Sequence, residues 1–297
     1  MSSPKIRVAV LGTGNIGTDL CERLLLDDEF EVVAVVGRRT DSPGLQRFEG
    51  RIKNVISNGI EGLGSIVDDI DGAFDATSAY SHAEHWSYMK DNGTWMMDLT
   101  PSRIGTPVVP ELLDEVSSMS LNNELVSNYS MVTCGGQSSA PLMHAMAKNS
   151  RGISEVEVSS SIASLSAGPA TRRNIDQYIA STEDLVRILT GCSSVKSILV
   201  LNPAEPPVMM RTTVQMRVQN CNVEAAKENA AAIVKRVQKY VPGYDIAVEP
   251  YLKGSDLISA TAKVVGAGYY LPPYAGNLDI INAAAVQTAR LHARKFQ

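Results

Sequence analysis

Cys134 is the residue whose neighbours best suit it to act as a nucleophile. It stands in the segment MVTCGGQ, residues 131–137, immediately before a helical stretch in which Pro141 is predicted to occupy the first turn. A helix N-terminus lowers the pKa of a thiol, and the N–H groups of Gly135 and Gly136 are unshielded donors that could hold an oxyanion. We therefore predict that Cys134 is catalytic.

The other three cysteines lack this setting. Cys21 lies in an apolar helical stretch, Cys192 follows a helix end, and Cys221 is close to a turn, so each is predicted to serve packing or to lie at the surface. The sequence contains no CxxC pair, and we expect neither a disulfide framework nor a metal site.

A glycine-rich loop predicts dinucleotide binding. The stretch VAVLGTGNIG, residues 8–17, places a GxGxxG pattern directly after a strand and before a helix. Gly12 would permit the tight turn, Gly14 would let a pyrophosphate approach, and Gly17 would let helix and strand pack closely. The helix N-terminus would supply free N–H groups and a partial positive charge for the phosphates.

The end of the second strand bears on the choice between NAD and NADP. An acid at that point favours NAD, whereas an arginine favours the 2′-phosphate of NADP. This chain has Arg38 and Arg39 there. Both could instead be solvated cations of a loop, so the pattern leaves NAD and NADP open.

A dinucleotide site combined with an activated cysteine indicates one chemistry. The thiolate adds to an aldehyde, the thiohemiacetal passes hydride to the cofactor, and a thioester results. Water, phosphate or a thiol could then accept the acyl group, and these residues alone do not decide among the three.

The elements that must position these groups fall into two halves. Alternating strands and helices predict a parallel, doubly wound Rossmann sheet in residues 1–131. Residues 132–276 predict an α+β domain whose sheet has one covered face, and the ligand cleft is expected between the halves. The predicted strands cover 6–11, 31–36, 72–76, 95–99, 154–162, 196–201, 212–218, 245–250 and 257–265, and the predicted helices 16–26, 174–189, 223–240 and 278–296.

Composition narrows the class of protein. With 297 residues, 44% of them hydrophobic and a net charge of -5, the chain suits a two-domain globular protein rather than a nucleic-acid-binding one. No apolar run reaches the length of a membrane span, and the N-terminal apolar run ends too early for a signal peptide. We expect a cytoplasmic location.

Beyond these patterns, the chain resembles the acylating acetaldehyde dehydrogenases, which act with 4-hydroxy-2-oxovalerate aldolases in aromatic catabolism. The resemblance spans nearly the whole chain. It rests on GNIGTD (14–19), FDATSA (74–79), DLTP (98–101), residues 128–137, SAGP (166–169), NPAEPP (202–207) and YAGNLD (274–279).

The resemblance implies a two-domain fold like that of glyceraldehyde-phosphate dehydrogenase, with the C-terminal helix 277–297 packed back on the Rossmann domain. It implies oxidation of an aldehyde, acetaldehyde by default, to an acyl-CoA with NAD or NADP and coenzyme A, through a thioester on Cys134. A homodimer or larger assembly, with an aldolase partner, is also implied. Dinucleotide contacts are implied at Thr13, Gly14, Asn15, Ile16, Ser166, Ala167, Gly168, Pro169, Ala170, Thr171, Arg172, Arg173, Asn174 and Asn277.

Three positions depart from the family pattern. Arg39 stands where relatives carry an acid, which bears on NAD preference. Thr212 replaces an aspartate that helps to deprotonate the cysteine, so a different base, or a higher thiol pKa, is expected; loss of a negative neighbour would act in the opposite direction. The stretch between Pro242 and Tyr270 is shorter than usual.

Other candidate residues have plainer interpretations. His82 and His85 are predicted to lie at the surface or in a loop, and His144 to pack on its helix. Glu205 is a second candidate for the base, although the flanking prolines favour a rigid loop. Arg172 and Arg173 could meet phosphates or solvent equally.

Two other functions remain open at this point. One is a semialdehyde-dehydrogenase-type reductase of an acyl phosphate, which the few histidines disfavour. The other is a non-catalytic dinucleotide-binding subunit, which the intact MVTCGGQ segment disfavours.

Overall fold

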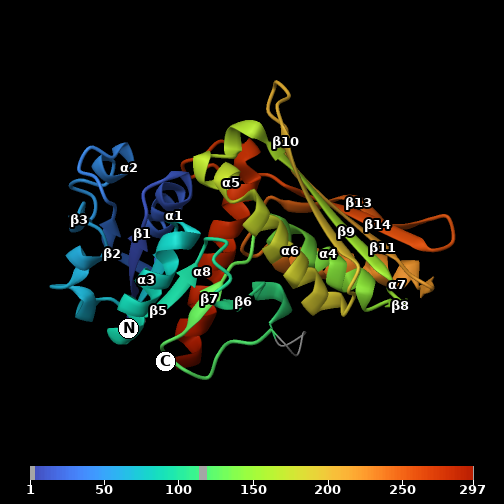
Figure 1. Ribbon diagram of the computed structural model, residues 1–297, viewed down its shortest axis with the longest axis horizontal. Coiled ribbons are helices and arrows are strands. Elements are labelled where there is room, and N and C mark those ends of the chain that lie inside the picture. Colours follow the sequence, from blue (N-terminus) through green and yellow to red (C-terminus); the bar gives the residue numbers. More distant parts are fainter. Residues whose placement is uncertain (1–3, 114–118, 297) are drawn as a thin grey trace.

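The computed structural model describes residues 4–113 and 119–296, which form two large sheets side by side and a small two-stranded sheet (Figure 1). The first sheet has seven parallel strands in the order β3-β2-β1-β4-β5-β7-β6. Its first five strands run outward from a central β1, as in a Rossmann sheet. The strands are β1 (Ile6–Leu11), β2 (Phe30–Val36), β3 (Asn54–Ile56), β4 (Gly72–Asp75), β5 (Trp95–Asp98), β6 (Thr106–Pro107) and β7 (Asn128–Ser130).

Strand β1 is apolar throughout because both of its faces are covered. Ile6, Val8 and Val10 pack in one core cluster with helix α1 (Asn15–Leu25) and helix α8 (Gly276–Phe296). Ala9 and Leu11 pack in another cluster, which includes residues of helix α3 (Ala79–Asp91). This is the pattern expected of a parallel strand buried on both sides.

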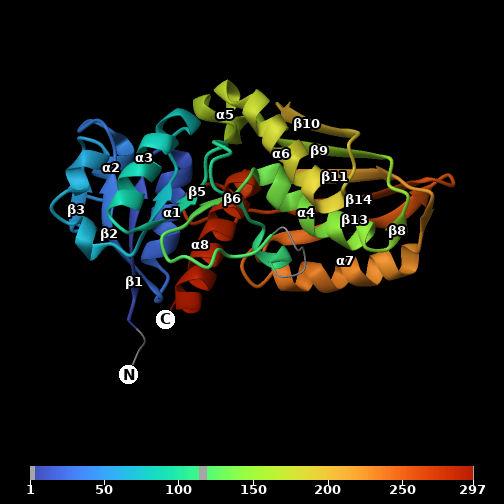
Figure 2. The same ribbon diagram turned by 60° about the horizontal axis from the view of Figure 1, so that its bottom comes forward.

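The second sheet has five strands in the order β10-β9-β11-β14-β13 and is mostly antiparallel. Helices α4 (Cys134–Ala147), α6 (Ile175–Thr190) and α7 (Val223–Val237) lie on one face of it (Figure 2). Its strands are β9 (Glu155–Ala163), β10 (Val195–Asn202), β11 (Met210–Arg217), β13 (Tyr244–Lys253) and β14 (Leu257–Val264). Small elements join these units: β8 (Ser150–Arg151), β12 (Asn220–Cys221), α2 (Pro43–Gln46) and α5 (Pro169–Arg173).

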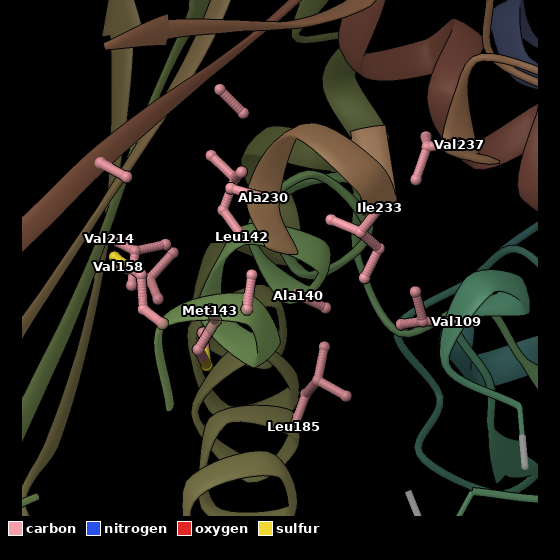
Figure 3. Close-up of a cluster of buried hydrophobic side chains, with 14 of the residues drawn as sticks. Val109, Ala140, Leu142, Met143, Val158, Leu185, Val214, Ala230, Ile233 and Val237 are labelled. Carbon is pink, nitrogen blue, oxygen red and sulfur yellow. The ribbon is translucent and has the colours of Figure 1, made fainter. Parts of the chain in front are cut away.

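The core of this second half is built around α4. Figure 3 shows Leu142 and Met143 of α4 between sheet residues, such as Val158 and Val214, and residues of α7, such as Ile233. Alternate residues of β9 and β11 point into this core, which explains their alternating burial.

Most predicted elements are present with ends shifted by a few residues. Helix α3, the short helices α2 and α5, and the short strands β3, β6, β7, β8 and β12 were not predicted. Pro141 does not stand in the first turn: it lies inside α4, because the helix already begins at Cys134.

The domain boundaries remain a prediction, and residues 1–3 and 297 lie outside the described part. Among the described helices, none combines the length and the hydropathy needed to span a bilayer.

Candidate active site

A cavity of about 570 Å³ opens beside the glycine-rich loop, at the carboxyl ends of the strands of the first sheet. Residues 12–16 form one wall, and Ser166, Gly168, Pro169, Thr171 and Arg173 close it from the other half. Such a crevice at the reversal of strand order is where open α/β sheets bind ligands. The cleft expected between the two halves is therefore present.

Each of the three glycines of the loop is suited to its position for a different geometric reason. Gly12 has a φ of +96°, and a Cβ there would lie 2.8 Å from the Ala76 carbonyl oxygen. A Cβ on Gly17 would lie 2.0 Å from the Gly12 carbonyl oxygen, so that glycine lets α1 approach the loop but does not line the cavity. A Cβ on Gly14 would meet nothing within 4 Å; that glycine faces open space at the start of α1.

Cys134 is the first residue of α4, after a tight turn from β7. Thr133 caps the helix, because its Oγ1 accepts the Gly136 N–H at 2.8 Å. Val132, a β-branched residue, has a φ of 58°, a conformation that costs such a side chain energy and that is found at functional sites. Gln137 fixes the turn by donating to the carbonyl oxygens of Val108 at 2.7 Å and Met131 at 3.0 Å.

The capping geometry corrects one prediction. The N–H of Gly136 is not an unshielded donor, because it is used by the Thr133 cap. Gly135 and Gly136 are both buried, and a Cβ on Gly135 would lie 2.0 Å from Tyr178 Oη. Gly135 is thus required for the close approach of α6, which carries Tyr178.

The pKa of Cys134 is shifted opposite to the predicted direction. Burial raises the pKa of the thiol to about 11 and outweighs the hydrogen bonds from Tyr178 and the Gly135 N–H, which lower it. The Sγ lies 3.9 Å from Tyr178 Oη. The helix N-terminus alone therefore does not make this cysteine a thiolate at neutral pH.

A narrow pocket of about 90 Å³ connects Cys134 with the larger cavity, since both are lined by Ile16, Thr77 and Thr171. Two buried polar atoms in its lining, Thr100 Oγ1 and Asn277 Oδ1, have no hydrogen-bond partner among the described residues. Unpaired buried polar groups are costly, and both residues line a space that a ligand could fill.

Some of the remaining candidates for dinucleotide contact line the cavity or the narrow pocket, and others line neither. Asn174 lines the narrow pocket. Arg172 is turned away from it and donates to the Ser164 and Ala167 carbonyl oxygens, at 3.1 and 3.0 Å. Ala167 is buried outside both linings, and the side chain of Ala170 lies outside the described part of the structure.

The two arginines after β2 differ in position. Arg38 lines the cavity and hydrogen-bonds to Ser81 Oγ. Arg39 is exposed and makes a bidentate pair with Asp41, at 2.9 and 2.7 Å. Only Arg38 is thus positioned at the cavity wall.

The prediction that His82 and His85 lie at the surface is wrong. Both are buried on α3, and the Nδ1 of each lies 2.9 Å from Asp75 Oδ2. Burial lowers the pKa of His82, but the Asp75 hydrogen bond and the charges of Asp98 and Asp75 outweigh it, so the net pKa is raised. Burial raises the pKa of Asp75, yet the two histidines bring it well below its usual range.

This cluster gives a testable pH dependence of stability. His82→Asn should lower the free energy of unfolding by about 2 kcal/mol, the size of a charge-assisted hydrogen bond. The Asp75 contribution is present above its ordinary pKa of 3.8 and is lost as the pH falls through its depressed folded pKa. The His82 contribution is present below 6.5 and is lost as the pH rises through its raised folded pKa. Urea unfolding should show the largest difference between pH 3.8 and 6.5; a constant difference up to about pH 9 would contradict this account.

The other candidate bases lie away from the thiol. His144 lines a separate cavity with Lys148 and Leu189, and Glu205 is exposed in the loop between β10 and β11. Thr212 is fully buried on β11, with its Oγ1 3.2 Å from Ser160 Oγ. All four cysteines are free, and residues 4–113 and 119–296 contain no cluster of side chains that could hold a metal ion.

Comparison with known proteins shows a family and a fold. Residues 134–272 match the family described as prokaryotic acetaldehyde dehydrogenase, dimerisation. Acetaldehyde dehydrogenase of Spirochaeta aurantia is 42% identical, with 99% of this chain and 97% of the relative covered. That of Pectobacterium atrosepticum is 40% identical, with 97% and 95% covered. The solved structure of Vibrio cholerae aspartate semialdehyde dehydrogenase II, complexed with ASA, has a TM-score of 0.67 at 14% identity, covering 99% of this chain and 100% of that one.

The fold places the chain in the glyceraldehyde-phosphate-dehydrogenase-like class of α/β proteins, as predicted from the sequence. Within that class, the full-length identity of about 40% decides the family: the chain belongs to the acetaldehyde dehydrogenases.

Proposed function

We propose that the protein is a CoA-acylating aldehyde dehydrogenase that converts an aldehyde, acetaldehyde by default, CoA and NAD(P)⁺ into acyl-CoA and NAD(P)H. The observation that carries the proposal is the position of Cys134, at a helix start, in a narrow pocket that opens into the cavity beside the glycine-rich loop. Family membership supports the aldehyde as substrate.

The residues present fit a nicotinamide dinucleotide. The open side of Gly14 leaves room for a pyrophosphate against the N-terminus of α1. The unpaired Asn277 Oδ1 is an acceptor of the kind that a nicotinamide carboxamide N–H requires, and it lies in the lining that also contains Cys134. When bound there, the dinucleotide supplies a hydride acceptor.

The chain itself supplies the nucleophile and the orientation. The Cys134 thiolate attacks the aldehyde carbon, and the Thr100 hydroxyl, which has no other partner among the described residues, is a free donor for the developing oxyanion. After loss of hydride, Cys134 holds the acyl group as a thioester. The CoA thiol then takes the acyl group and releases Cys134.

Assembly and location are parts of the same proposal. The description of the matched family region as a dimerisation region supports a homodimer or larger assembly. An aldolase partner and a cytoplasmic location rest on the family resemblance alone. Light scattering of the purified protein, alone and with a 4-hydroxy-2-oxovalerate aldolase, tests the first two points.

We further propose that NADP is accepted and that Arg38, rather than Arg39, provides the contact. Arg38→Gln should weaken NADP binding about tenfold, the value of a charge-assisted hydrogen bond to the 2′-phosphate, and should leave NAD binding unchanged. Arg39→Gln is the matched control, because Arg39 is already paired with Asp41. Fluorescence titration with both dinucleotides measures this; equal losses in the two variants would contradict the assignment.

The activity is tested by NAD(P)H formation with acetaldehyde and longer aldehydes, with CoA, phosphate or water as acceptor. The proposal expects sustained turnover only with CoA. In its absence, one acyl group should accumulate on Cys134, detected by peptide mass spectrometry. Turnover with phosphate instead would favour the semialdehyde-dehydrogenase-type reaction, and failure with every aldehyde and acceptor would favour a non-catalytic subunit.

A further inference from the structure

Three buried hydroxyl groups form a chain of contacts that begins at Cys134. Cys134 Sγ lies 3.9 Å from Tyr178 Oη, and the Tyr178 hydroxyl interacts in turn with the Ser160 side chain. Ser160 Oγ lies 3.2 Å from Thr212 Oγ1. All three hydroxyl-bearing side chains are at least nine-tenths buried.

The pairing of β9 with β11 places two of these hydroxyl groups, those of Ser160 and Thr212, side by side. Ser160 of β9 and Thr212 of β11 are direct partners in the antiparallel register. Their side chains point to the helix-covered face, where the neighbours two residues away are apolar: Val158 and Ile162 on β9, and Met210 and Val214 on β11. The hydroxyls interrupt this apolar face below the start of α4.

Helix α6 carries Tyr178 and is held in place at the same point. Thr182, one turn further along, donates to the Tyr178 carbonyl oxygen at 2.9 Å and lies 2.8 Å from Thr133, the cap of α4. A Cβ on Gly135 would lie 2.0 Å from Tyr178 Oη and 2.7 Å from Ser160 Oγ. The phenol is therefore closely confined beside the cysteine.

We infer that Tyr178, oriented by Ser160 and Thr212, supplies the hydrogen bond that stabilises the Cys134 thiolate, so that this chain activates its nucleophile through buried hydroxyls instead of a side-chain base. Ionisation transfers the thiol proton to water or a buffer base in the pocket. The Tyr178 hydroxyl, whose oxygen accepts from the thiol, then turns its O–H to donate to the sulfur anion. Tyr178 contacts the reacting atom, whereas Ser160 and Thr212 are positioning residues.

The electrostatic surroundings support this role. Cys134 and Tyr178 are the titratable side chains among the described residues that line the pocket, and none of the other lining residues is charged. Burial raises the pKa of Tyr178 well above its usual value, so the phenol keeps its proton and remains a donor. Burial raises the pKa of Cys134, and among the described residues Tyr178 and the backbone at 134 and 135 lower it.

The test is the pH dependence of Cys134 alkylation by iodoacetamide, followed by peptide mass spectrometry. Tyr178→Phe should raise the midpoint by about one pH unit and slow the reaction about tenfold at neutral pH, since a hydrogen bond to a charged group is lost. Thr212→Val should slow it about threefold, because it acts only through the orientation of Tyr178. Adding Thr212→Val to Tyr178→Phe should then have no further effect.

Tyr244→Phe is the matched control. Its buried phenol donates to the Ser138 carbonyl oxygen of the same helix at 2.8 Å but does not line the pocket. Its alkylation profile should equal that of the unmodified protein. An unchanged midpoint in Tyr178→Phe, an equal shift in Tyr244→Phe, or full additivity in the double variant would overturn the inference. If Tyr178→Phe does not fold, Ser160→Ala gives the same decision through a smaller shift.

The inference rests on the proposed function, because that function is what requires Cys134 to ionise. The experiments nevertheless distinguish the failure of one from the failure of the other. Alkylation requires neither aldehyde nor dinucleotide. Absence of turnover with an intact Tyr178 effect refutes the proposed function alone, and turnover without a Tyr178 effect refutes only the inference.

Discussion

Cys134→Ser should lower acyl-CoA formation at least about ten-thousandfold, the scale of loss when a covalent nucleophile is removed. A serine hydroxyl is not ionised at neutral pH, and the side chains near residue 134 include no base to accept its proton. The Thr133 cap and the Gln137 hydrogen bonds do not involve Sγ, so the turn should keep its geometry. Dinucleotide affinity, measured by calorimetry, should therefore stay unchanged.

Cys221→Ser is the matched control, because Cys221 is also half-buried and carries a free thiol. It should retain full turnover and still acquire the acyl group on Cys134 when CoA is absent. Substantial turnover in Cys134→Ser, or an acyl adduct on Cys21, Cys192 or Cys221, would contradict the assigned nucleophile.

Local patterns predicted the parts of this site that are contiguous in sequence. The loop at 12–17 follows a strand and precedes a helix, and its glycines have the turn and packing geometry expected of them. Cys134 was predicted to lie just before a helix with Pro141 in its first turn, and it is in fact the first residue of α4, which begins earlier than predicted. These patterns are local, although Gly12 is also confined by Ala76 and the turn before Cys134 is also held by the Val108 carbonyl oxygen.

Contacts distant in sequence were not predictable from such patterns. Tyr178 reaches Cys134 across 44 positions, and Thr212 reaches Ser160 across 52. The sequence carried one signal that was missed: Ser160 and Thr212 interrupt rows of apolar residues with period two. Such an interruption indicates a buried hydroxyl, but only the pairing of β9 with β11 places the two together.

The burial of His82 and His85 could not be predicted from the sequence pattern around them. His82, His85 and Met89 are the buried residues of α3, at helical spacing, but the helix as a whole is polar and was not predicted. The net pKa of Cys134 was misjudged for a related reason. The helix N-terminus is visible in the sequence, whereas the burial that opposes it depends on tertiary packing.

Gly14→Ala and Gly17→Ala should both weaken dinucleotide binding at least about a hundredfold, but with different effects on stability. A Cβ on Gly14 meets no protein atom within 4 Å and projects where we propose the pyrophosphate lies. It should leave the unfolding midpoint unchanged while removing about two charge-assisted N–H contacts.

A Cβ on Gly17 would lie 2.0 Å from the Gly12 carbonyl oxygen, so α1 must move away from the loop. Such overpacking costs about 1–3 kcal/mol of stability and also misplaces the phosphate donors. Gly64→Ala is the control, since its nearest contact, the Glu61 carbonyl oxygen, is an ordinary 3.4 Å away. Calorimetric titration and urea unfolding of the three variants test this. Undiminished binding by Gly14→Ala would show that the dinucleotide does not approach the loop there, and Cys134 alkylation, which depends on the other domain, should be unchanged in all three.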